Sequence, residues 1–174
     1  LRAGCADPGG AQGDRNVIVH PAPQGSEAWV KARLGIPSAS QFHRLLTPRT
    51  RKPSSSADGY AYELLAEHFL GVPLDGASSG LMQRGTQMEE EACYWYELQQ
   101  DVEATPVGFC LRDDGKVGAS PDRLIGDDGL LEIKCHAPKL HIAYLLGEAA
   151  DEHVLQMQGQ LWVTGRRWVD LLCY

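Results

Sequence analysis

The feature that most constrains the fold is a hairpin pattern at residues 122–135. The segment 126–129 reads Gly-Asp-Asp-Gly, and an Asp-Gly step between two apolar runs is a strong hairpin signal. The strand that follows, 130–135, alternates between two faces. One face carries Leu131, Ile133 and Cys135, and the other carries Glu132 and Lys134. The pattern therefore predicts a pair of antiparallel strands with one buried face.

Three polar side chains converge if these two strands pair. Asp122 opens the first strand, so pairing brings it near Glu132 and Lys134. Two carboxylates beside a lysine suit a hard divalent ion, which takes oxygen ligands and keeps several waters. Such an ion stabilises charge on a phosphoryl group, and a nearby lysine can orient water. A surface hairpin with an ordinary Glu-Lys pair would show the same pattern, so residues 122–134 alone leave both interpretations open.

The order of the remaining elements indicates the fold class. Helical patterns occupy most of residues 26–99, and strands, two further helices and a last strand follow. This order predicts an α/β fold with a central mixed β-sheet flanked by helices. The sheet is expected to contain the segments 105–111, 117–125, 130–135 and 168–174.

Length and charge indicate one domain with an uneven charge distribution. The chain has 174 residues, 43% of them hydrophobic, and a net charge of −7. This is enough for a single domain over residues 16–174, while the Gly-rich residues 1–15 are expected to be a flexible tail or an expression remnant. Residues 26–57 hold six Lys/Arg and one acid, a local net charge of +5. This segment and its loop 47–56 are either a DNA-facing side or a solvated basic surface.

Cysteine usage and hydropathy exclude several classes. The five cysteines show no C-x-x-C spacing, which disfavours a disulfide framework, a zinc site or an iron–sulfur site. Reduced thiols predict a cytoplasmic protein. No apolar run is long enough to span a membrane, and no secretory signal pattern opens the sequence.

Other polar residues occupy positions that need an explanation. Glu89 shares a helix face with Ala92, Cys93 and Tyr96, where a carboxylate is costly unless it is paired, bound to metal, or reaches water at the boundary. Ser40 lies at the start of a helix where Ser38 and Gln41 fit a capping box, so it either caps or, with Arg33, binds a phosphate. Gln156 and Gln160 share one stripe of the helix at 152–164.

Five segments, in order, resemble the phage lambda exonuclease (YqaJ-type alkaline exonuclease) branch of the PD-(D/E)XK nuclease superfamily. The matching segments are AWVKARLGIPSASQF (28–42), RGTQMEEEA (84–92), ASPDRL (119–124), LEIKC (131–135) and LQMQGQLWVTG (155–165). The resemblance covers about residues 25–174 and implies a restriction-endonuclease-like core.

The resemblance implies a role for each matching residue. Asp122 and Glu132 resemble the two metal-binding acids, with the Ile133 carbonyl completing that shell. Lys134 resembles the lysine that activates the attacking water, and Glu89 the helix glutamate that helps to hold a second metal or its waters. Gln156 resembles the first glutamine of a Q-x-Q helix near the scissile phosphate. The expected 5'-phosphate pocket comprises Arg33, Ser40 and Ser120.

The resemblance also implies an activity. Such enzymes are Mg²⁺-dependent, with two ions expected, and Mn²⁺ fits the same oxygen ligands. They digest linear double-stranded DNA from the 5' end to mononucleotides and leave a 3' single-stranded tail for recombination. They usually form a homotrimeric ring and work beside a single-strand annealing protein. A restriction-like or repair endonuclease, or a non-catalytic DNA-end-binding adaptor, remains an alternative.

Overall fold

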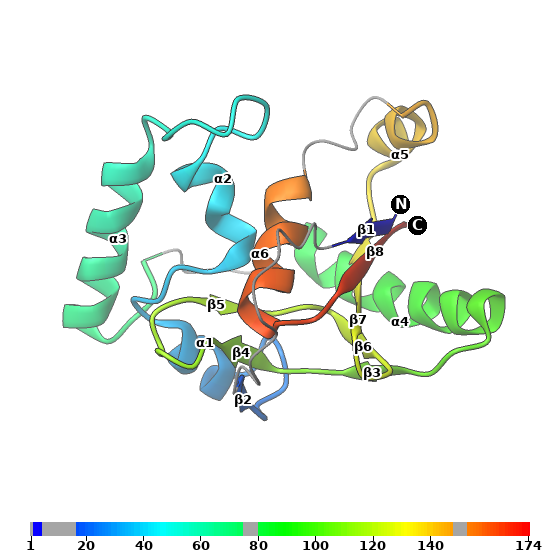
Figure 1. Ribbon diagram of the computed structural model, residues 1–174, viewed down its shortest axis with the longest axis horizontal. Helices are drawn as coiled ribbons and strands as arrows, with labels where there is room; N and C mark the ends of the chain where they lie inside the picture. The colour runs from blue at the N-terminus through cyan, green and yellow to red at the C-terminus, as the bar shows by residue number, and fades with distance from the viewer. Residues whose placement is uncertain (1, 5–16, 75–79, 148–152) are drawn as a thin grey trace.

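A computed structural model describes residues 2–4, 17–74, 80–147 and 153–174, except for the side chains of residues 80–87. The helical elements are α1 (Glu27–Arg33), the 3₁₀ turn η1 (Ala39–Gln41), α2 (Phe42–Leu45), α3 (Ala57–Leu70), α4 (Gly80–Gln100), α5 (Pro138–Leu145) and α6 (Val154–Thr164). The strands are β1 (Arg2–Gly4), β2 (Ile18–His20), β3 (Ala104–Pro106), β4 (Phe109–Leu111), β5 (Gly118–Ala119), β6 (Arg123–Ile125), β7 (Gly129–Lys134) and β8 (Trp168–Cys173). Figure 1 shows their arrangement.

The central layer is a five-stranded mixed sheet in the order β1-β8-β7-β6-β3. The predicted hairpin is confirmed, with Arg123 opposite Leu131 and Ile125 opposite Gly129 in an antiparallel β6–β7 pair. β8 runs parallel to β7 and pairs with its whole length. The predicted fold class, an α/β fold with a mixed sheet flanked by helices, is confirmed.

The prediction of one continuous sheet is wrong, because the segments 105–111 and 117–125 each divide between two sheets. β3 and β6 belong to the five-stranded sheet, whereas β4 and β5 join β2 in a separate three-stranded sheet. Pro106 ends β3 and Pro121 separates β5 from β6, and a proline cannot donate a hydrogen bond to a sheet. Gly108 passes so close to the His20 carbonyl that a Cβ there would lie 2.0 Å from its oxygen.

Residues 2–4 differ from the flexible tail that the sequence predicts for residues 1–15. They form β1, which pairs with β8 in an antiparallel register. Arg2 donates two hydrogen bonds to Asp170, and its guanidinium lies 4.2 Å from the centre of the Trp168 ring. Residues 5–15 lie outside the described residues.

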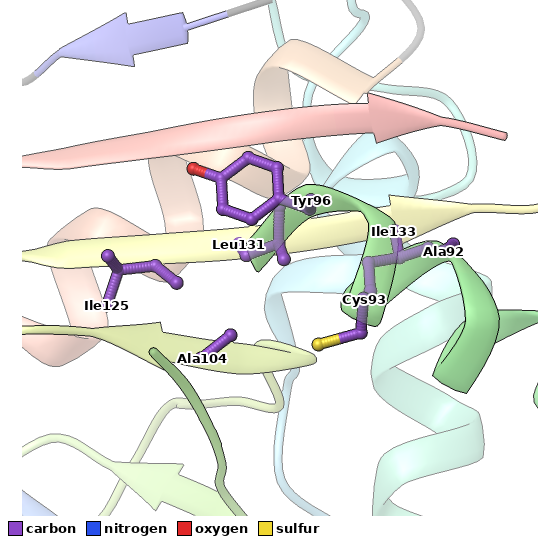
Figure 2. Packing of buried hydrophobic residues seen from close by; sticks show 7 residues of the cluster. All are labelled: Ala92, Cys93, Tyr96, Ala104, Ile125, Leu131 and Ile133. Carbon is purple, nitrogen blue, oxygen red and sulfur yellow. The ribbon is translucent and has the colours of Figure 1, made fainter. Parts of the chain in front are cut away.

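Helices α4 and α6 cover opposite faces of the five-stranded sheet (Figure 1). On the α4 side, the buried cluster comprises Ala92, Cys93, Tyr96, Ala104, Ile125, Leu131 and Ile133 (Figure 2). On the α6 side, Leu130 and Val169 pack against Met157 and Leu161. The alternation of β7 thus places Glu132 and Lys134 on the side that faces α6.

One local capping prediction is confirmed and one differs from the structure. Ser26 caps α1 by accepting from the Trp29 amide, as expected. Ser38 makes no capping hydrogen bond, because its hydroxyl contacts Ser40 and Arg33 instead. Within the described residues, no helix is both long enough and apolar enough to cross a membrane.

Candidate active site

The β6–β7 hairpin brings Asp122, Glu132 and Lys134 together, as predicted. Asp122 precedes β6 and accepts a hydrogen bond of 2.6 Å at Oδ2 from the Ile133 amide. Lys134 Nζ lies 2.6 Å from Glu132 Oε1. Glu132 is 1% exposed, so its carboxylate requires partners to compensate for lost hydration.

Helix α6 supplies those partners from two positions one turn apart. Gln156 Nε2 donates to Glu132 Oε1, and Gln160 Nε2 donates to Glu132 Oε2. Both side chains lie on the stripe that the sequence predicts, since residues four apart share a helix face. The role of Gln160 in holding the carboxylate was not predicted. The sequence signal for it was its position four residues after Gln156, on the same helix face.

The electrostatics of the group favour a cation. Burial and the neighbouring charge of Glu132 raise the pKa of Asp122 well above its ordinary value, although the Ile133 amide opposes this. Burial lowers the pKa of Lys134, but the charge and hydrogen bond of Glu132 outweigh burial and raise it overall. A single ammonium therefore neutralises one of two neighbouring carboxylates, and a divalent ion would neutralise the remainder.

Asp122 and Glu132 fit a Mg²⁺ site, since one or two carboxylates usually suffice when waters complete the shell. The structure records the Ile133 amide on Asp122 but no contact that assigns the Ile133 carbonyl. Across the described residues, no group of three or more His, Cys, Asp or Glu side chains converges as a metal site. Asp122, Glu132 and Glu89 therefore do not form a three-acid ligand group among the described residues, although Glu89 and the Asp122 carbonyl share the donor Arg123 Nη1.

Glu89 lies on the buried face of α4, as predicted, but its printed partner is an arginine. Arg123 Nη1 donates to Glu89 Oε1 at 2.9 Å, and Arg123 Nη2 donates to Glu90 Oε1 at 2.8 Å. Arg123 was not predicted as a site residue. Its place between Asp122 and an apolar strand was the only sequence signal.

A second polar cluster gathers the residues expected to bind a 5' phosphate. Arg33 Nη2 donates to Ser38 Oγ at 3.4 Å, and the hydroxyls of Ser38 and Ser40 are 2.9 Å apart. The Arg33 guanidinium stacks 4.0 Å from the centre of the Trp29 ring. Trp29 Nε1 in turn donates to Ser120 Oγ at 3.1 Å, so Ser120 joins the same cluster.

The charge of Arg33 has no salt-bridge partner among the described residues. Burial lowers its pKa, and its buried Nε has no hydrogen-bond acceptor in the described part of the chain. A partly buried guanidinium with spare donors and two neighbouring hydroxyls is a suitable receptor for phosphate oxygens.

A cavity of about 330 Å³ is lined by residues of α2, α6 and the segments next to them. Its lining residues are Ser40, His43, Pro48, His153, Leu155 and Gln156. Ser40 thus belongs both to the cavity and to the Arg33 cluster, and Gln156 belongs both to the cavity and to the Glu132 group. The cavity therefore shares one lining residue with each of the two polar groups.

The model of the YqaJ-like viral recombinase domain family matches residues 28–167. The chain belongs to this family. The match runs from α1 to the residue before β8 and includes every predicted site residue. No curated protein matches the chain.

Solved structures of two proteins share the fold of this YqaJ-like domain. An alkaline exonuclease (LHK-Exo) from Laribacter hongkongensis is 35% identical with a TM-score of 0.74, covering 86% of this chain and 74% of that chain. The same protein in complex with dAMP gives 36% identity and the same TM-score of 0.74 over the same shares of the two chains. A phage-related exonuclease from Haemophilus somnus 129PT is 14% identical with a TM-score of 0.59, covering 80% of this chain and 68% of that chain, which bears on the fold alone.

Proposed function

We propose that this YqaJ-like domain is a metal-dependent exonuclease that degrades linear double-stranded DNA from its 5' end. The observation that carries the proposal is one cavity lined by a residue from each of two polar clusters. Gln156 lines it and donates to Glu132, and Ser40 lines it and contacts Ser38, to which Arg33 donates. The alkaline exonuclease activity named for LHK-Exo supports the same reading.

In this proposal Asp122, Glu132 and the Ile133 carbonyl hold one Mg²⁺ ion, and Glu89 helps to hold a second ion or its waters. Mn²⁺ would bind the same oxygen ligands. A divalent ion bound there supplies Lewis-acid stabilisation of the phosphate charge. Carboxylate oxygens are ligands that favour these hard ions over zinc.

The chain's own residues orient the reactants. Lys134 Nζ contacts Glu132, and the Lys134 side chain is 26% exposed, so it can also orient an attacking water or offset charge that develops on the phosphate. Gln156 lines the cavity and holds Glu132 in a fixed orientation. Such fixed donors and carboxylates accelerate the reaction because the geometry is established before the substrate arrives.

The Arg33 cluster would set the polarity of digestion. A terminal 5' phosphate bound by Arg33, Ser40 and Ser120 would place the next phosphodiester towards Glu132 and Gln156. The product would then be a mononucleotide, and the partner strand would remain as a 3' single-stranded tail. The exposed loop residues Arg49, Arg51 and Lys52 form no salt bridge within the described chain and follow Pro48, which lines the cavity. They would contact backbone phosphates of the duplex.

The assembly and its partners complete the proposal. A homotrimeric ring would let an acidic chain hold DNA in a channel lined by its basic segment. A single-strand annealing protein would receive the 3' tail during recombination. The mass of the protein in solution, by light scattering with and without duplex DNA, tests the trimer directly.

The test is digestion of a linear duplex labelled at either end, beside a closed circle, with Mg²⁺ or with a chelator. Release of the 5' label as mononucleotides, only with Mg²⁺ and with the circle intact, is the expected result. Cutting of the circle would favour an endonuclease, and binding without cleavage would favour an adaptor. Asp122→Asn should abolish cleavage while DNA binding persists.

Arg33→Met tests the phosphate pocket separately. Hydrogen bonds to a charged group contribute about 1.5–3 kcal/mol, so cleavage of a 5'-phosphorylated duplex should slow by about 10–100-fold. A 5'-hydroxyl duplex serves as the matched substrate, because it lacks the charge that Arg33 would bind. Equal slowing of cleavage on both substrates would show that Arg33 does not bind the 5' phosphate.

A further inference from the structure

Position 123 carries a charge where the strand pattern calls for an apolar side chain. Arg123 pairs with Leu131 across the β6–β7 hairpin, and side chains directly opposite share one face of a sheet. That face is the buried α4 side, where Ile125 and Leu131 pack with Cys93 (Figure 2). Arg123 is 7% exposed. A buried guanidinium loses its hydration at a free-energy cost that an apolar side chain does not carry. Its hydrogen-bond partners must therefore compensate for that cost.

The partners of Arg123 belong to the proposed metal site. Nη1 donates both to Glu89 Oε1 and to the Asp122 carbonyl, the latter at 2.8 Å. Nη2 donates to Glu90, whose side chain is 81% exposed, so water competes and that pair contributes little. The Glu89 side chain is 28% exposed, which makes it the stronger partner. One nitrogen of Arg123 therefore contacts both the Glu89 side chain and the Asp122 backbone.

We propose that Arg123 is a positioning residue for the metal site, which holds the Glu89 carboxylate in a fixed orientation beside Asp122. This inference rests on the proposed function. With Oε1 engaged by Arg123, Oε2 is the Glu89 oxygen that remains for an ion or its waters. The guanidinium also offsets the repulsion between Glu89 and Asp122 before an ion binds.

An arginine suits this role better than a lysine. Its planar group presents Nη1 and Nη2 in a fixed fork, which spans the successive residues Glu89 and Glu90 and still reaches the Asp122 carbonyl. A lysine has one nitrogen on a flexible stem and cannot span the same acceptors. The fork links α4 to the start of β6, the two elements that carry Glu89 and Asp122.

The test is calorimetric titration with Mn²⁺ of the wild-type chain, Arg123→Met, Arg123→Lys, Glu89→Gln and Glu90→Gln. Loss of an outer partner of a metal ligand typically lowers metal affinity about 10–100-fold, and this is the expected effect of Arg123→Met. Arg123→Lys should recover part of the affinity, and the control Glu90→Gln should change it by no more than about threefold. The Mn²⁺ concentration for half-maximal cleavage should rise by the same factor.

The double variant Glu89→Gln/Arg123→Met separates positioning from general packing. Because Arg123 acts through Glu89, the double variant should bind Mn²⁺ as Glu89→Gln does. Wild-type Mn²⁺ affinity in a folded Arg123→Met protein would overturn the inference. So would a double variant whose loss of Mn²⁺ affinity equals the product of the two single-variant losses. If Arg123→Met does not fold, Arg123→Lys keeps the buried charge and carries the test, and wild-type Mn²⁺ affinity in it would overturn the inference.

The failure of this inference differs from the failure of the proposed function. A wild-type protein that binds no Mn²⁺ and degrades no DNA would remove the proposed function and the inference together. A protein in which Asp122→Asn and Glu89→Gln impair Mn²⁺ binding, while Arg123→Met does not, would keep the function and reject the role of Arg123.

Discussion

Lys134→Met should destabilise the metal-free protein strongly, because it leaves Glu132 as a buried charge without a counter-charge. The Glu132 carboxylate is 1% exposed, and Lys134 Nζ lies 2.6 Å from Oε1. Met has a similar length and packs in the same place, so the substitution removes the charge with little change in volume. The two glutamines of α6 still donate to Glu132, but neither carries a charge.

The expected loss is about 3 kcal/mol of unfolding free energy. Removing one partner of a buried ion pair typically costs about 3–5 kcal/mol. The lower end applies because the Lys134 side chain is 26% exposed and water already screens part of the attraction. With a urea dependence of about 2 kcal/mol per molar, the unfolding midpoint should fall by about 1.5 M.

The assay is urea unfolding in the presence of a chelator, with Glu132→Gln/Lys134→Met as the partner variant and Lys116→Met as the control. The double variant removes the unpaired Glu132 charge, so its free energy of unfolding should lie within about 1 kcal/mol of that of the wild type. Lys116 is exposed and forms no salt bridge among the described residues, so its change should stay within about 0.5 kcal/mol. A loss below about 1 kcal/mol in Lys134→Met, or equal losses in the single and double variants, would refute the reasoning. Added Mg²⁺ should stabilise Lys134→Met by mass action if it binds beside Glu132.

Three further predictions follow from packing, charge and burial. Gly159→Ala would place a Cβ 2.7 Å from the Phe42 ring and 2.9 Å from the Ala39 Cβ, so it should cost about 1–3 kcal/mol in thermal or urea unfolding. A Cβ at Gly59 in α3 would meet nothing within 4 Å, so Gly59→Ala should be neutral or stabilise the protein by up to about 1 kcal/mol. Equal changes in stability for Gly159→Ala and Gly59→Ala would contradict this packing argument. Burial opposes ionisation of Asp170, but hydrogen bonds from Arg2 and Tyr96 outweigh it and lower the pKa of Asp170. Its stabilisation is therefore present above the unfolded-state pKa of about 3.9 and is lost as the pH falls towards the lower folded value. Asp170→Asn should consequently differ from wild type most at neutral pH and least near about pH 2, and a constant difference across pH-dependent urea titrations would contradict the assignment. Burial raises the pKa of Cys110 to about 11, so a thiol reagent should label Cys110 only after unfolding, and rapid labelling of the native protein would show that this burial is wrong.

The sequence predicts the central hairpin well because two local signals agree there. The Asp-Gly turn and the alternation of residues 130–135 both act over a few residues, and the β6–β7 pair confirms the hairpin. The pairing then places Asp122, Glu132 and Lys134 together without information from elsewhere. The stripe of Gln156 and Gln160 is predictable in the same way, from helical spacing alone.

Features that depend on distant contacts are predicted poorly. Division into two sheets depends on the passage of Gly108 beside His20, which no local pattern reveals. β1 exists because β8 offers an edge and Asp170 offers a partner to Arg2. Ser120 is linked to Arg33 and Ser40 in the sequence only by resemblance, whereas the contacts among them run through Trp29 and Ser38. The roles proposed for all these site residues remain predictions.

In the proposed reaction, the boundary between the two sheets would fix the distance between the bound 5' phosphate and the bond that is cut. Ser120 lies just beyond the end of β5 in the three-stranded sheet, and Asp122 lies just before β6 in the five-stranded sheet, with only Pro121 between them. A phosphate anchored near Ser120 and a bond cut near Asp122 would therefore stay at a separation that this rigid step fixes. One inserted residue would lengthen the step by up to about 3.3–3.6 Å, which is comparable to the rise of about 3.4 Å between successive nucleotides of a DNA strand. The length of the backbone step at Pro121 would then determine the length of the released fragment.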